Sequence, residues 1–181
     1  MDDRRRRFEA QALPHLDAAI NLARWLTRSN ADADDVVQDA MLRAWRAFDG
    51  FRGGDIRPWL LAIVRNCSRT SAGARKRRGH VALPEENSPM SGEAMTFDGP
   101  SPEASAIRSD EGRKLDAVIA TLPEEFREVL ILREMEDLSY REIATVTEVP
   151  IGTVMSRLAR ARAMLREKWV GDVESEASNA V

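Results

Sequence analysis

The chain has 181 residues, of which 43% are hydrophobic, so it can bury one ordinary core or two small ones. Its 27 Lys and Arg residues stand against 30 Asp and Glu residues, and the formal net charge of −3 excludes a global positive field that would draw it onto nucleic acid. One cysteine and two histidines are too few for a disulfide framework or for a four-ligand zinc site, so we expect no metal and no cofactor.

The start of the chain reads MDDRRRRF, with no apolar run behind its arginines. No later segment approaches the roughly 18 uninterrupted apolar residues that a membrane span needs. We therefore expect no membrane insertion and a cytoplasmic location. The arginines Arg4 to Arg7 are either a disordered basic start or a segment that touches DNA or a protein partner.

Residues 1–80 are predicted to form an N-terminal helical bundle, broken near Pro14, by the stretch FDGFRGGD and at Pro58. The segment DADDVVQDAMLRAWRAF has an apolar seam that predicts a core face. A second stripe has the spacing i, i+3, i+4 and i+7 and contains Asp35, Gln38, Asp39 and Leu42. An acidic stripe with an exposed leucine is typical of a docking site for a basic helical partner, although an ordinary solvated face has the same pattern.

The next segment, FRGGDIRPWLLAIVRN, combines a glycine-rich loop with a helix, and the basic run Arg75 to Arg78 follows. Aromatic rings beside arginines and an amide suit unstacked single-stranded bases, which stack on rings and bond to polar side chains. The candidates are Phe51, Arg52, Trp59, Arg65, Asn66 and Arg69. Trp59 equally suits a core position, and the basic run either tracks phosphates or is solvated.

Residues 81–112 are rich in Pro, Gly, Ser and acidic side chains, which predicts a flexible acidic linker. Residues 113–170 return to helical periodicity, and residues 171–181 are predicted to be a frayed polar tail. No strand pattern of any length occurs in the sequence. The predicted fold is therefore all-α, with two small helical domains joined by the linker.

The C-terminal domain has the pattern of a helix-turn-helix. One helix should open near Pro123, and a second should begin at Ser139 and end near Thr147, because Ser139 and Glu142 have the capping-box spacing. A break at EVPIG should precede a third helix that begins at Thr153. Its apolar face carries Val154, Leu158, Ala161 and Leu165, and its opposite face carries Ser156, Arg157 and Arg160, with Arg162 and Arg166 on the flanks. Such a basic face suits a DNA major groove, although arginines near a helix end also solvate a surface.

Together these segments resemble one family, the extracytoplasmic-function (ECF) group of bacterial sigma-70 factors. DADDVVQDAMLRAW resembles the segment that binds the clamp helices of the RNA polymerase β′ subunit, and FRGGDIRPWLLAIVRN resembles the segment that reads and melts the minus-ten element. The stretch from LPEEFREVL to SRLARAR resembles region four, which reads the minus-thirty-five element and touches the polymerase β flap. The resemblance covers nearly the whole chain.

The resemblance implies roles for the candidate residues. The acidic stripe would hold core RNA polymerase, and the aromatic and basic set would lie by the opened minus-ten strand of promoter DNA. The minus-thirty-five set would be Thr153, Met155, Ser156, Arg157, Ala159 and Arg160, where Met155 and Ala159 replace the basic or larger side chains that members often carry. Members are often held inactive by an anti-sigma factor, which makes such a factor an expected partner.

Three other functions are weighed against this one. A helix-turn-helix transcriptional regulator that is not a polymerase subunit would share the C-terminal domain, but it would leave FRGGDIRPWLLAIVRN and the acidic stripe without a purpose. An enzyme is not expected, because the sequence has no phosphate-cradling loop, nucleophile motif or metal-ligand cluster. An adaptor that only engages another protein is the third alternative.

Overall fold

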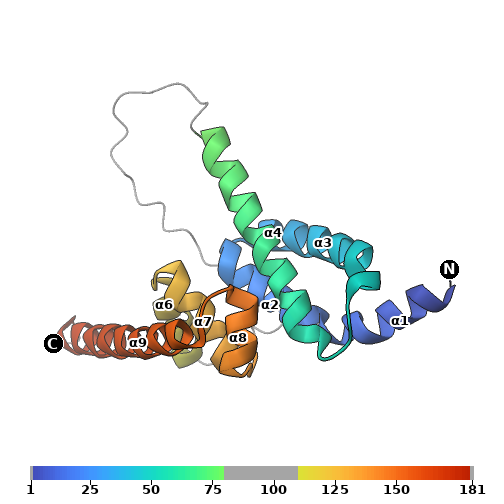
Figure 1. The fold of residues 1–181 in the computed structure, drawn as a ribbon. Helices are drawn as coiled ribbons and strands as arrows, with labels where there is room; N and C mark the ends of the chain where they lie inside the picture. Colours follow the sequence, from blue (N-terminus) through green and yellow to red (C-terminus); the bar gives the residue numbers. More distant parts are fainter. Residues whose placement is uncertain (1, 80–109, 180–181) are drawn as a thin grey trace.

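The computed structural model describes residues 2–79 and 110–179, with side chains over 3–74 and 111–170. The first part contains α1 (Asp2–Ala12), η1 (Leu13–His15), α2 (Leu16–Thr27), α3 (Asn30–Ala47), η2 (Phe48–Gly50) and α4 (Ile56–Gly79). The second part contains α6 (Asp110–Ala120), α7 (Glu124–Glu134), α8 (Tyr140–Thr147) and α9 (Ile151–Asn179). Within these ranges the fold has no strand, so the all-α prediction is confirmed (Figure 1). The predicted linker lies outside the described residues, except that 110–112 begin α6.

The N-terminal domain is a bundle in which α2, α3 and α4 pack against one another. The apolar seam predicted for α3 faces inward, with Val36 and Ala40 buried against Trp25 of α2 and Leu61 of α4. Arg28, in the left-handed conformation, ends α2, and Ser29 begins α3 by accepting a hydrogen bond from the backbone N–H of Asp32 at 3.3 Å. This packing holds α3 with its acidic stripe turned away from the core.

The arginine-rich start of the chain is helical and packed, which excludes one of the two alternatives for it, a disordered basic start. Phe8 of α1 meets Trp45 and Phe48 edge-on, with ring centroids 5.4 and 5.2 Å apart. Arg4 donates to Asp49 at 2.9 Å and to the backbone oxygen of Trp45 at 2.7 Å. These contacts fasten α1 to the segment that leads into the glycine-rich loop.

The C-terminal domain contains the predicted helix-turn-helix, formed by α8 and α9. The capping box is present at the start of α8: the backbone N–H of Ser139 donates to Glu142 at 2.7 Å, and that of Glu142 donates to the Ser139 hydroxyl at 3.3 Å. Helix α8 ends at Thr147 as predicted. Val154, Leu158 and Ala161 of α9 are buried against α7 and α8, which confirms the apolar face.

Helix α9 is longer than the sequence predicts at both ends. It begins at Ile151, because the oxygen of Pro150 accepts from the backbone N–H groups of Thr153 and Val154 and so makes the proline the first acceptor of the helix. Gly152 is accommodated in the first turn. The helix then continues through Asn179, whereas a frayed tail is predicted from 171.

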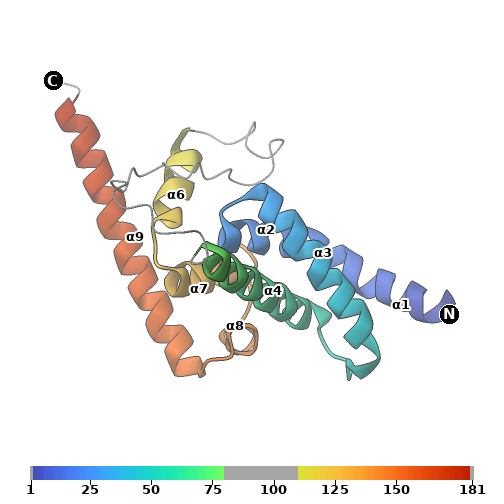
Figure 2. The same cartoon turned by 90° about the horizontal axis from the view of Figure 1, so that it is seen from above.

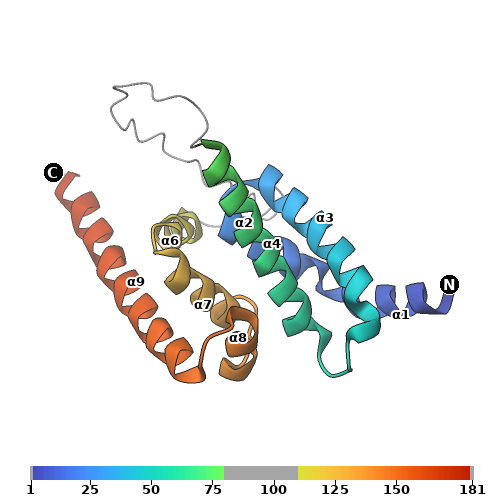
Figure 3. The ribbon, with the colours of Figure 1, turned by 45° about the horizontal axis from the view of Figure 1, so that its top comes forward.

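The two domains pack against each other in three layers (Figures 2 and 3). Helix α9 forms the outer layer, α6, α7 and α8 form the middle layer, and the N-terminal bundle lies on the other side. Helix α8 packs along α4, and α7 packs against α2. Buried residues of both domains, from Leu22 and Leu61 to Ile131 and Ile143, belong to one continuous apolar cluster. The shared core therefore fixes the position of α3 and α4 relative to α9, and with it the positions of the predicted functional residues.

Candidate nucleic-acid interface

The acidic stripe lies on an exposed face of α3. Asp35 and Gln38 are exposed, and 56% of Leu42 is exposed although it is a large apolar residue. Asp39 is half-exposed and forms an ion pair with Arg43 one turn later, with 2.9 Å between Oδ2 and Nη2. An exposed leucine between polar side chains suits a protein-binding surface, because the leucine would gain free energy from burial in a partner. The stripe's role stays a prediction.

The glycine-rich loop between η2 and α4 places an aromatic pair at the end of the N-terminal bundle. The Phe51 and Trp59 rings have centroids 5.1 Å apart, and both side chains are partly buried. Gly53 and Gly54 adopt φ values of 88° and 95°, which side chains with a Cβ rarely adopt. Asp55 then caps α4 by accepting from the backbone N–H of Arg57 at 2.9 Å. Arg52 points from this loop into solvent at an exposed position.

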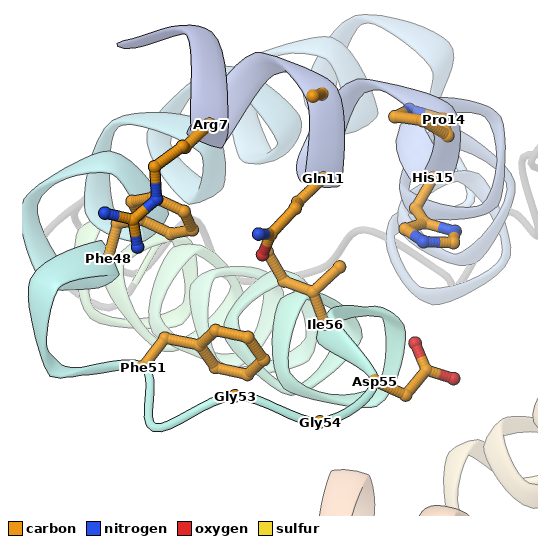
Figure 4. Close-up of a pocket in the computed structure, with 11 residues that line it drawn as sticks. Arg7, Gln11, Pro14, His15, Phe48, Phe51, Gly53, Gly54, Asp55 and Ile56 are labelled. Atoms are coloured by element: carbon orange, nitrogen blue, oxygen red, sulfur yellow. The ribbon is translucent and has the colours of Figure 1, made fainter. Parts of the chain in front are cut away.

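A pocket of about 450 Å³ opens between this loop and α1 (Figure 4). Phe51 of the loop lies on one side of it, and Arg7, Gln11 and His15 bring hydrogen-bonding groups from the other side, where the Arg7 guanidinium lies 5.8 Å from the centroid of the Phe48 ring. Flat rings combined with polar side chains can hold a planar heterocycle such as an unstacked base. The sequence did not predict these residues of α1 and η1 as part of the site. The run Arg4 to Arg7 indicated a basic segment, but it did not indicate where that segment packs on the domain.

The remaining candidates of the N-terminal domain lie farther along α4, and one of them is buried. Asn66 and Arg69 are exposed, but Arg65 is only 3% exposed because α7 and α8 cover it. The Nε of Arg65 donates to Oε1 of Glu128 at 2.5 Å, and its Nη1 lies 3.7 Å from Oε2 of Glu148. The predicted set is thus divided between the loop end of α4 and the domain interface.

Glu128 is a functional candidate that the sequence did not reveal. It lies on α7 with only 4% of its surface exposed, and burial raises the pKa of its carboxyl while the neighbouring Arg65 guanidinium acts in the opposite direction. A second buried carboxylate, Glu136, accepts from Arg57 at 2.7 Å and from Asn21 at 2.6 Å. In the sequence both glutamates look like ordinary solvent-exposed acidic residues.

The basic face of α9 is largely open. Ser156, Ala159 and Arg160 are exposed, and 53% of Met155 is exposed. Thr153 is partly buried and accepts a hydrogen bond from the Ser156 hydroxyl at 3.0 Å through its backbone oxygen. The turn before the helix contains Glu148 at φ 56°, in the left-handed conformation that ends α8. A helix presented in this way can enter a major groove.

Two arginines of α9 are engaged by glutamates of α7. Arg157 donates to Glu125 at 3.1 Å, and Arg162 donates to Glu134 at 2.6 Å. Arg157 also lines a cavity of about 570 Å³ between the domains. Arg65, Arg69 and several glutamates line the same cavity. Residues predicted to contact two different DNA elements therefore face one shared cavity.

The described part of the chain has neither a metal site nor a membrane span. Across residues 2–79 and 110–179, no group of three or more His, Cys, Asp or Glu side chains is placed to hold a metal ion. In the same ranges, every helix is too short or too polar to cross a lipid bilayer.

Two regions of one protein family match this chain over most of its described length. Residues 13–78 match Sigma-70 region 2, and residues 112–165 match Sigma-70, region 4. The RNA polymerase sigma-H factor of Pseudomonas aeruginosa is 34% identical over 166 residues, which are 87% of this chain and 83% of that protein. The ECF RNA polymerase sigma-E factor of Escherichia coli K12 is 36% identical over 145 residues, covering 77% and 74%.

A similar fold occurs in a solved complex. The sigma factor RpoE from Bartonella quintana, crystallised with the anti-sigma factor NepR, superposes with a TM-score of 0.71 and 27% sequence identity. The superposition covers 88% of this chain and 94% of that one. Helix α1 precedes the matched region 2, so most of the pocket's polar side is formed by residues outside or at the edge of that match.

Proposed function

The chain belongs to the sigma-70 family of RNA polymerase sigma factors, in its ECF group, and from this membership we propose how its residues direct promoter-specific transcription initiation. The observation that supports the proposal most strongly is that one chain exposes both the acidic stripe of α3 and the basic face of α9. The first surface suits a protein and the second suits duplex DNA. A sigma factor needs both at once.

The stripe formed by Asp35, Gln38, Asp39 and Leu42 binds the β′ clamp helices of core RNA polymerase in this proposal. Leu42 supplies an apolar anchor, and the carboxylates supply complementarity to a basic partner surface. Asp39 exchanges its ion pair with Arg43 for one across the interface. The C-terminal domain would contact the polymerase β flap.

The loop end of α4 reads the opened minus-ten strand. Phe51 and Trp59 offer rings for stacking, Arg52 offers a charge for phosphates, and the pocket beside Phe51 has room for an unstacked base. Asn66 and Arg69 are exposed farther along α4 and would contact the strand there. Arg7 and Gln11 of α1 and His15 of η1 would hydrogen-bond to the base edge. The two glycines would let the backbone approach the strand.

The basic face of α9 reads the minus-thirty-five element in the major groove. Ser156 and Arg160 are placed to reach base edges, and Arg157 would leave Glu125 to bind DNA. Met155 offers an apolar contact to a thymine methyl group, and Ala159 allows close approach of the helix. Thr153 lies at the helix start, where its backbone meets phosphate.

Regulation by an anti-sigma factor is part of the proposal, because the RpoE relative was crystallised with one. We also propose that the chain acts in the cytoplasm, where core polymerase and promoters are, and that it has no enzymatic activity of its own. A helix-turn-helix regulator independent of polymerase is not favoured, because residues 13–78 match region 2.

Reconstituted run-off transcription tests the proposal. Core RNA polymerase with genomic DNA fragments should produce discrete new transcripts only when this protein is added. Asp39→Lys should abolish these transcripts and weaken polymerase binding, because it places a positive charge against a basic surface. Asp17→Lys on α2, an exposed acidic position outside the stripe, is the matched control and should remain active. Equal activity of both variants would contradict the role of the stripe.

The DNA contact is tested in the same assay. Arg160→Ala should cost about 1–3 kcal/mol of promoter binding and relax one base preference in the minus-thirty-five element, whereas Arg160→Lys should retain phosphate attraction but lose bidentate base recognition. Binding of the assembled holoenzyme to single-base promoter variants would measure both effects. An unchanged base preference would remove Arg160 from the reading face.

A further inference from the structure

Helix α1 forms one wall of the pocket beside Phe51, and it lies before residue 13, where the match to region 2 begins. The helix has 11 residues. Isolated helices shorter than about 12–15 residues are marginal in water, so α1 depends on its contacts with the rest of the domain. The groups that fasten α1 therefore decide where this wall of the pocket stands.

Two neighbouring stripes of α1 have different surroundings. Arg4, Phe8 and Ala12 recur every four residues and face the domain. Phe8 and Ala12 are buried, and 33% of the Arg4 side chain is exposed. Arg7 and Gln11 form the next stripe and point from α1 towards the loop (Figure 4). One short helix thus carries both its own attachment and part of the pocket lining.

Arg4 joins α1 to three groups at the start of the glycine-rich loop. Its Nε donates to Oδ1 of Asp49 at 2.9 Å, and its Nη2 donates to the backbone oxygen of Trp45 at 2.7 Å. Its guanidinium carbon also lies 4.0 Å from the centroid of the Trp45 ring. The Trp45 oxygen belongs to the last turn of α3, where the helix dipole favours a cation. A guanidinium can hold these groups together, because its donors form a rigid planar fork.

We propose that Arg4 is a positioning residue for minus-ten recognition, which holds α1 so that Arg7 and Gln11 reach the edge of the base in the pocket. This inference rests on the proposed function, in which the pocket takes an unstacked base. Arg4 is not among the residues that line the pocket, so it acts through the side chains that do. Its partner Asp49 lies two residues before Phe51, and Arg4 therefore fixes the two walls relative to each other.

A displaced α1 would affect base discrimination more than it affects stacking. Hydrogen bonds weaken steeply when the donor moves or tilts, whereas stacking on a ring such as Phe51 tolerates every base. Loss of the Arg4 contacts should therefore reduce the preference for one base at a single minus-ten position. Binding to core polymerase through the stripe of α3 should be preserved, because that stripe lies on another face of the domain.

Holoenzyme assembled from core RNA polymerase and the full chain tests the inference on a promoter found by run-off transcription. All four bases would be placed in turn at each minus-ten position, and transcript yield would give the base preference. Arg4→Lys keeps the positive charge but has no fork to hold both Asp49 and the Trp45 oxygen, so it should lower the preference at one position roughly tenfold. Gln11→Ala should lower the preference at the same position.

Arg5→Met is the matched control. Arg5 is exposed on the same helix, and its Nε donates to Glu9 of that helix at 2.7 Å. The variant therefore removes a positive charge without touching the attachment of α1 to the loop. It should weaken promoter binding slightly and equally for all four bases, because phosphate attraction carries no base information.

A double variant separates positioning from a general effect on stability. Arg4→Lys added to Gln11→Ala should cause little further loss of preference, because both changes remove the same contact with the base. Multiplied losses in the double variant, an unchanged preference in Arg4→Lys, or an equal loss in Arg5→Met would each overturn the inference. Arg4→Met, which retains an apolar stem, decides the matter if Arg4→Lys fails to fold by circular dichroism.

Failure of the proposed function would look different. The wild-type chain would then give no promoter-specific transcripts with core polymerase. Specific transcripts whose minus-ten preference does not depend on Arg4 would contradict the positioning role alone.

Discussion

Cys67 illustrates how burial controls chemistry at a single residue. Its side chain is 2% exposed on α4, and burial, with a further contribution from Asp39, raises the pKa of its thiol to about 11. The thiolate is the reactive form, so at neutral pH almost none is present. The native protein should not react with a thiol-specific reagent such as DTNB at pH 7.5, while the unfolded chain should release one equivalent. Rapid labelling of the folded protein would contradict this assignment.

Burial of single residues was predictable where it depends on one helix and not where it depends on two domains. Leu158 and Val154 follow a helical period, so the sequence predicts their core positions correctly. Arg65 has no such pattern, because its burial results from Glu128, which is more than sixty positions away in the sequence. Pairing of distant charges leaves no local signal.

The capping box of α8 gives a prediction at the level of one helix. The Ser139 hydroxyl and the Glu142 side chain satisfy two backbone donors at the start of this eight-residue helix. Ser139→Ala should lower the free energy of unfolding by about 1 kcal/mol. Ser139→Asp, which keeps an acceptor at the cap, should remain near the wild-type value. Urea unfolding followed by circular dichroism would measure both, and equal stability of the alanine variant would mean that the cap contributes little.

The sequence predicts which segments form helices better than it predicts where those helices begin and end. The capping residues and the break at Pro150 indicated α8 and α9 correctly, because local backbone bonding decides these features. The start of α9 at Ile151 was missed because Gly152 reads as a helix breaker. The sequence did not decide whether the N-terminal arginines are ordered. The position of α1 depends on Phe8, which packs against Trp45 of α3 and Phe48 of η2.

The charge of the whole molecule predicts how it behaves without polymerase. A net charge of −3 and basic groups confined to local patches provide few phosphate contacts at once. The isolated chain should therefore show no nanomolar complex with promoter duplex in an electrophoretic shift at physiological salt. A stable complex should form once core polymerase is added, because polymerase holds both domains on the same DNA. Nanomolar binding by the isolated chain would contradict this account.

The division into two helical domains was predictable from composition and periodicity, but their mutual placement was not. The interface depends on Glu128 and Glu136, which have the spacing of solvated positions, and on an apolar cluster shared by both domains. Only the folded surfaces reveal that these faces complement each other. The polymerase and DNA roles of individual residues stay predictions until the variants are measured.

The closed placement of Arg65 also bears on how the molecule searches a chromosome. Non-specific sites vastly outnumber promoters, and any protein with freely available phosphate-binding groups is partitioned onto them. A chain that keeps Arg65 inside its own interface offers one phosphate-binding group fewer to such sites, while the basic face of α9 stays exposed. A smaller share of the protein is then held on non-specific DNA, and a larger share is free to bind polymerase.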